Sequence, residues 1–90
     1  MTSDWLDLEQ AAALLGGDRE FIEEAIEHGL VAADRLDPEA VEQVRVARTL
    51  VRELEVNWAG VEIVLRLRSE LIETRRQVAL LIDKLRQRET

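Results

Sequence analysis

The feature that most constrains this chain is the stretch from Trp58 to Arg88, which has no proline and a single glycine, Gly60, near its start. Both residue types interrupt helices, so one unbroken helix can run through the stretch. Asn57 precedes it and is a good N-cap, because its side-chain oxygen accepts hydrogen bonds from free N–H groups of the first turn. At ~1.5 Å per residue this helix would be roughly 45 Å long, more than a small domain needs for its own core. We therefore expect something outside the domain to cover its apolar side.

Apolar residues of this stretch recur at the a and d positions of a heptad repeat, interrupted only at Thr74 and Arg88. Such a stripe favours a coiled coil between two copies of the chain, and we expect a homodimer. The alternative is that the helix folds back or packs only on its own domain, but the stripe is longer than the small core requires. The predicted dimer interface consists of Val64, Leu67, Leu71, Val78, Leu81 and Leu85.

Three shorter helices are predicted before the long one. Each begins after an aspartate that can cap it, and the first two end at glycines. Two short helices joined by a tight glycine turn have the form of a helix-turn-helix. We expect residues 1–56 to form a helix-turn-helix-like domain with a third helix, and residues 57–90 to form the long helix, as one structural unit. The caps are Asp7, Asp18 and Asp37, and the helix ends are Gly16-Gly17, His28-Gly29 and a point near Leu54.

The composition agrees with a small all-α domain. Ninety residues bury a limited fraction of their surface, and the chain has one Pro, four Gly and no Tyr. The absence of Cys excludes disulfides and thiolate metal sites, and a reducing cytoplasm is the natural expectation. We find no signal-peptide pattern and no run of about twenty apolar residues, so no membrane span is expected.

Charge is distributed unevenly along the chain, whose formal net charge is −7. Residues 1–57 contain fourteen acidic and five basic residues, a net charge of −9. Residues 58–90 contain five acidic and seven basic residues, a net charge of +2. Nucleic-acid affinity depends largely on Lys and Arg side chains that neutralise phosphates, and a negative surface repels phosphates. The distribution therefore argues against DNA as a partner and favours a protein with a basic surface.

Three groups of residues resemble landmarks of the MerR-type helix-turn-helix family. They are Leu15-Gly16-Gly17, Gly29-Leu30 and Val56-Asn57-Trp58-Ala59-Gly60-Val61. The similarity covers nearly the whole chain and is greatest to the chaperone-linked branch, which includes the heat-shock regulator HspR and the chaperone modulator CbpM. The resemblance implies a MerR-like helix-turn-helix domain with a reduced wing, followed by a long dimerisation helix.

Departures from the family pattern separate its branches. In DNA-binding members the second helix is the recognition helix, with Arg, Thr and Tyr on its exposed face, and a wing rich in Arg and Tyr follows. Here the matching face has four glutamates, with Arg19 as the only base, and six residues, 31–36, separate Leu30 from the next cap. An acidic recognition helix and a truncated wing are poorly suited to holding a DNA backbone.

The resemblance to CbpM implies a non-enzymatic adaptor that binds the J-domain of a CbpA-like co-chaperone and inhibits it. J-domains present a basic helix to DnaK, so an acidic competitor is physically sensible. The alternative function is a MerR- or HspR-type DNA-binding transcriptional regulator. For the glutamates, the alternative to a docking surface is an ordinary solvated helix face. The predicted partner-binding residues are Glu20, Glu23, Glu24 and Glu27.

Catalysis, metal ions and cofactors are not expected. The chain has no Cys, no Tyr and one histidine, His28, whose candidate co-ligand is Glu24 one turn earlier. Two ligands without a third rarely form a metal site, and no glycine-rich loop is placed to hold phosphate.

The two tryptophans have different expected roles. Trp5 is expected to pack in the core, whereas Trp58 fits a core or an interface role equally well. Beside Trp58, the small residues Ala59 and Gly60 are expected to let another helix approach closely.

Overall fold

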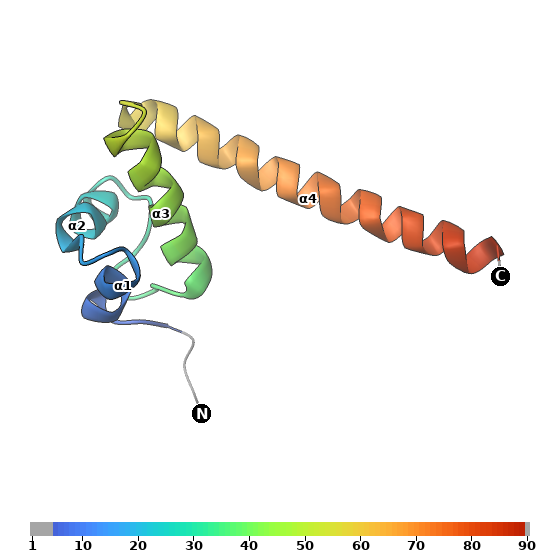
Figure 1. Cartoon of the computed structure of the whole chain (residues 1–90), viewed down its shortest axis with the longest axis horizontal. Helices are drawn as coiled ribbons and strands as arrows, with labels where there is room; N and C mark the ends of the chain where they lie inside the picture. The colour runs from blue at the N-terminus through green and yellow to red at the C-terminus, as the bar shows by residue number, and fades with distance from the viewer. Residues whose placement is uncertain (1–4, 90) are drawn as a thin grey trace.

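The computed structural model describes residues 5–89, and these residues form four α-helices. In order, they are α1 (Leu8–Leu14), α2 (Arg19–Glu27), α3 (Pro38–Arg52) and α4 (Trp58–Glu89). Figure 1 shows α1, α2 and α3 grouped into a small body, from which α4 projects as a long rod. Within the described part of the chain, the β-type pairing is limited to one isolated bridge between Leu6 and Leu36. The predicted all-α class is confirmed.

Every helix begins at the cap that the sequence predicts. In each case the side chain of the capping residue accepts a hydrogen bond from the backbone N–H three residues later. A bond of this kind stabilises a helix start by about 1 kcal/mol, and it depends on local sequence alone. The N–H groups of Gln10, Phe21, Ala40 and Gly60 donate to Asp7, Asp18, Asp37 and Asn57 over 2.7 to 3.1 Å.

The first two helices end at the predicted glycines, and the third ends two residues before Leu54. Gly17 and Gly29 adopt positive φ angles of 84° and 76°, the region that glycine enters without steric cost, and they follow α1 and α2 as expected. However, α3 ends at Arg52, and Leu54 is outside the helix with 62 % of its surface exposed. The reason is that the N–H groups of residues 53 and 54 both donate to the carbonyl of Thr49, which closes the last turn early.

The core lies where the three helices of the body meet the first two turns of α4. Leu36 of the connector reaches it, and its carbonyl accepts a 2.6 Å hydrogen bond from the N–H of Leu6. The prediction that Trp5 packs in the core is wrong, because 54 % of its surface is exposed. Successive side chains of an extended segment point to opposite sides, so Leu6 packs inward and Trp5 points away. The buried residues are Ala11, Ala12, Leu15, Phe21, Ile22, Ala25, Leu36, Val41, Val44, Ala47, Val61 and Leu65.

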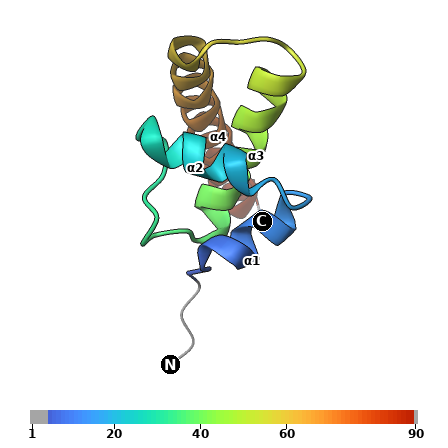
Figure 2. The same ribbon diagram turned by 90° about the vertical axis from the view of Figure 1, so that its left-hand side faces the viewer.

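Most of α4 lies outside this body. Its buried residues are Val61 and Leu65, and every side chain from Ser69 to Glu89 is exposed. The radius of gyration is 16.6 Å, against about 12 Å for a compact chain of this length. In Figure 2, α4 runs away from the viewer behind the body and does not fold back onto it. Among the described helices, none has both the length and the apolar content needed to cross a membrane.

The first turn of α4 is crowded, but not by another helix as predicted. A Cβ atom on Gly60 would lie 2.7 Å from Cγ1 of Val56 and 3.3 Å from Oδ1 of Asn57. Both neighbours belong to the turn that leads into the helix. The glycine therefore allows the chain to turn tightly from α3 into α4.

Replacing Gly60 by alanine should lower the free energy of unfolding by about 1 kcal/mol, because overpacking against the stiff side chain of Val56 outweighs the gain in helix propensity. Urea denaturation at fixed protein concentration measures the change. In a Val56→Ala background the same Gly60→Ala change should become stabilising. A loss of stability that is unaffected by Val56→Ala would contradict the close contact.

Asp18 joins α2 to α3 in addition to capping α2. Its Oδ2 accepts a 2.6 Å hydrogen bond from Nε of Arg48, and Oδ1 accepts from the N–H of Phe21. The Arg48 hydrogen bond, opposed by partial burial, holds the pKa of the Asp18 carboxyl below its ordinary value of 3.8. A carboxyl whose pKa is lowered on folding stabilises the fold above its unfolded pKa and loses that effect as the pH falls through its folded pKa.

Asp18→Asn keeps a capping oxygen but removes the charge opposite Arg48, so it should lower the free energy of unfolding by about 1 kcal/mol near neutral pH. The difference from the unaltered protein should shrink as the pH falls below 3.8, the ordinary pKa of the carboxyl, and through its lower pKa in the folded protein. Urea denaturation at neutral and acidic pH measures both effects. A difference that stays constant with pH would show that the Arg48 pair does not contribute.

Candidate functional site

The four glutamates predicted to bind a partner lie on the side of α2 that faces away from the core. Phe21, Ile22 and Ala25 form the buried side of this helix. The glutamates occupy positions 20, 23, 24 and 27, which share one face because of the 3–4 spacing. Glu20, Glu23 and Glu27 are exposed and Glu24 is half-buried. The structure therefore brings the predicted residues together, with three of them open to solvent.

Ion pairs divide these four residues into two kinds. Oε1 of Glu23 accepts a 3.1 Å hydrogen bond from Nε of Arg19. Oε2 of Glu24 lies 3.7 Å from Nη2 of Arg52 in α3. No ion pair forms at Glu20 or Glu27 within residues 5–89. The sequence does not distinguish the four, because spacing alone does not show which carboxylates have a cation beside them.

The arginines of the body are largely neutralised by carboxylates. Four of the five between residues 5 and 57 form an ion pair, and Arg35 in the connector is the exception. Arg19, the single base on the exposed side of α2, is paired with both Glu9 and Glu23. The body therefore offers unpaired anions to a partner and few free cations. The remaining pairs are Arg45–Glu42, Arg48–Asp18 and Arg52–Glu24.

The predicted dimer stripe on α4 is exposed along its whole length. It lies beside, and not within, the face that packs on α3, which carries Val61 and Leu65. Two interruptions, Thr74 and Arg88, are also exposed, as is Leu80 on the opposite side of the helix. The six predicted residues, which we call the α4 seam, are between 36 % and 59 % exposed: Val64, Leu67, Leu71, Val78, Leu81 and Leu85.

Trp58 lies at the junction of α2, α3 and α4, where sequence reasoning left its role open. Its ring stacks on Phe21 with centroids 5.5 Å apart, and on the His28 imidazole with centroids 4.4 Å apart and planes 12° apart. Arg52 of α3 lies over the Phe21 ring, 5.3 Å from its centroid. Spacing gave no signal for this stack, because its members are distant in sequence. The one available signal was scarcity, since the chain contains one Phe, two Trp and one His.

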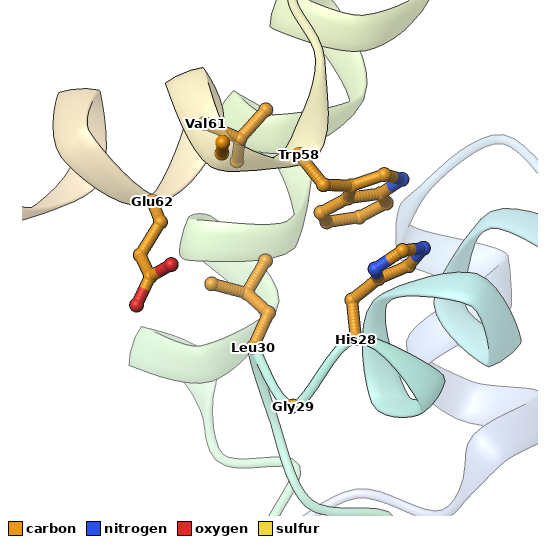
Figure 3. A pocket seen from close by; sticks show the side chains of 7 residues that line it. His28, Gly29, Leu30, Trp58, Val61 and Glu62 are labelled. Carbon is orange, nitrogen blue, oxygen red and sulfur yellow. The ribbon is translucent and has the colours of Figure 1, made fainter.

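His28 has no metal-binding environment in the part of the chain that the structure describes. No group of three or more possible metal ligands comes together among these residues. The imidazole follows the last turn of α2 and faces Trp58 (Figure 3). The suggested Glu24–His28 pair therefore gains no third ligand.

A pocket of about 390 Å³ opens beside this stack, between the end of α2 and the start of α4 (Figure 3). Its walls are mostly apolar, and Glu62 supplies a carboxylate at its edge. Sequence reasoning missed the pocket, because its two walls are about thirty residues apart in the chain. The lining residues are His28, Gly29, Leu30, Trp58, Ala59, Val61 and Glu62.

Comparison of the chain with protein-family models, with curated proteins and with solved structures found no match. The expected resemblance to MerR-type proteins therefore has no support beyond the three groups of residues in the sequence.

Proposed function

We propose that this protein is a non-enzymatic chaperone modulator of the CbpM-like branch of the MerR-type family. It binds the basic surface of a J-domain co-chaperone through the acidic face of α2 and inhibits that co-chaperone. In this proposal α1 and α2 are a helix-turn-helix that binds protein, and the α4 seam joins two copies into a homodimer in the cytoplasm.

The observation that carries the proposal is the polarity of the body. Its arginines are engaged by carboxylates, whereas Glu20 and Glu27 have no ion pair among residues 5–89. A surface with this polarity attracts a basic partner over a distance of about 10 Å at 0.1 M salt. It also suppresses binding to polyanions, because like charges approach each other at a cost.

The same observation weighs against the alternative of a DNA-binding transcriptional regulator. A DNA reader uses its recognition helix to donate hydrogen bonds to phosphates and base edges. On the exposed side of α2 the one available donor of this kind, Arg19, is already paired with Glu9 and Glu23. Freeing it would break both pairs and leave four carboxylates beside the phosphates.

The exposed α4 seam supports the homodimer. Single exposed apolar residues are normal on protein surfaces, but a continuous stripe is typical of an interface. The stripe here keeps a heptad spacing from Val64 to Leu85, with Thr74 as its interruption, and its apolar residues are all exposed. Pairing with a second copy removes this apolar surface from water.

Charge reversal of the two unpaired glutamates tests the docking face. The double variant Glu20→Lys/Glu27→Lys should weaken binding of a J-domain fragment about tenfold or more at low salt, because attraction is replaced by repulsion at two positions. Fluorescence anisotropy of a labelled J-domain fragment measures the affinity.

The matched control is Asp34→Lys/Glu53→Lys, which changes the net charge by the same amount at exposed positions outside α2. This control should bind nearly as well as the unaltered protein. Equal weakening by both variants would assign the effect to net charge and remove α2 from the site. Tight binding to duplex DNA, with no binding to the J-domain, would favour the transcriptional regulator.

The homodimer is tested by two neighbouring leucines of α4 with similar exposure. Leu81→Glu places a charge in the seam and should shift the protein from dimer to monomer in sedimentation equilibrium. Leu80→Glu makes the same change on the opposite side of the helix and should leave the dimer intact. A monomer before any substitution, or an unchanged mass for Leu81→Glu, would exclude a dimer through this seam. Truncation after Arg75 provides a second test of the same interface.

A further inference from the structure

We infer that the pocket between the end of α2 and the start of α4 binds an apolar side chain of the same basic partner, next to one of that partner's Lys or Arg residues. The inference rests on the proposed function for the partner's identity. It adds an apolar contact to the proposed electrostatic contact between the acidic face of α2 and the partner.

The pocket has the size and walls for such an anchor. Trp58 and Leu30 are half-buried and line it, and the ring of Trp58 is held in place by its stacks on Phe21 and His28. Figure 3 shows Trp58 and Leu30 on either side of the space, and the small residue Ala59 is also part of the lining. A rigid aromatic wall beside a small residue favours an inserted apolar group, because little side-chain freedom is lost on binding.

The polar groups of the pocket lie at its edge. Sites for small polar ligands need several converging polar groups inside the cavity. Here Glu62 and His28 are exposed, and among the described residues no buried side-chain nitrogen or oxygen lacks a hydrogen-bond partner. An apolar side chain of a larger molecule therefore fits the pocket better than a small polar ligand.

The charges beside the pocket specify the kind of segment that carries this side chain. Glu62 forms no ion pair within residues 5–89, and Glu27, also without one, directly precedes His28. The nearest base along α4 is Arg66, one turn beyond Glu62. An apolar residue next to a Lys or Arg would fill the pocket and also place a cation beside the carboxylates at its edge. The pocket adjoins the end of α2, so one basic helix can contact the acidic face and the pocket together.

Filling the pocket tests the inference. Ala59→Leu should weaken binding of the labelled J-domain fragment about tenfold or more, the effect of displacing one buried apolar side chain. The weakening should persist at 1 M salt, where the Debye length is about 3 Å, whereas that of Glu20→Lys/Glu27→Lys should largely disappear. Ala13→Leu, the same change at an exposed position of α1, is the matched control and should bind as the unaltered protein does.

A second variant tests the same site without adding bulk to the pocket, in case Ala59→Leu impairs folding. Glu62→Gln changes an exposed residue at the edge and should weaken binding several-fold at low salt and little at high salt. If Ala59→Leu and Glu62→Gln bind normally while Glu20→Lys/Glu27→Lys does not, the pocket inference is overturned and the proposed function stands. If the unaltered protein does not bind the J-domain fragment, both are overturned.

Discussion

The aromatic stack of Phe21, Trp58 and His28 is the interaction on which the rest of the structure depends. Phe21 is fully buried in α2, and Trp58 is the first residue of α4, so their contact holds the start of the long helix against α2. Arg52 at the end of α3 covers the Phe21 ring, which brings a third helix to the same point. Aromatic pairs contribute about 0.5–1.5 kcal/mol beyond the apolar area that they bury. The chain has one Phe and two Trp, and two of these three residues take part in this stack.

Anchoring α4 at one end separates two surfaces of different chemistry. The body holds the acidic residues, and its arginines are mostly paired with them. The rod carries an exposed apolar seam and a small excess of basic residues. A partner bound to α2 and a second copy bound along α4 contact different faces of the molecule. The proposed adaptor can therefore be a dimer and hold its partner without competition for the same residues.

Helix starts were predicted more accurately than the packing between elements, because the first depend on local contacts and the second on distant ones. The starts of all four helices were predicted correctly, because Asp7, Asp18, Asp37 and Asn57 bond to N–H groups only three residues away. Predictions about packing between elements distant in sequence were wrong at two positions. Trp5 is exposed, and the atoms near Gly60 belong to its own turn and not to another helix. Side-chain spacing predicts which face of a helix is apolar, but not which element covers that face.

By itself, the sequence determined the all-α class, the capped helix starts, the acidic face of α2 and the heptad seam of α4, since each follows from neighbours along one helix. Only the tertiary structure decided which carboxylates are paired. Arg52 reaches Glu24 across from α3, while Glu20 and Glu27 have no such neighbour among residues 5–89. It also decided that the end of α2 and the start of α4 form a pocket. Both results depend on the angles between helices, which are set by the packing of residues distant in sequence.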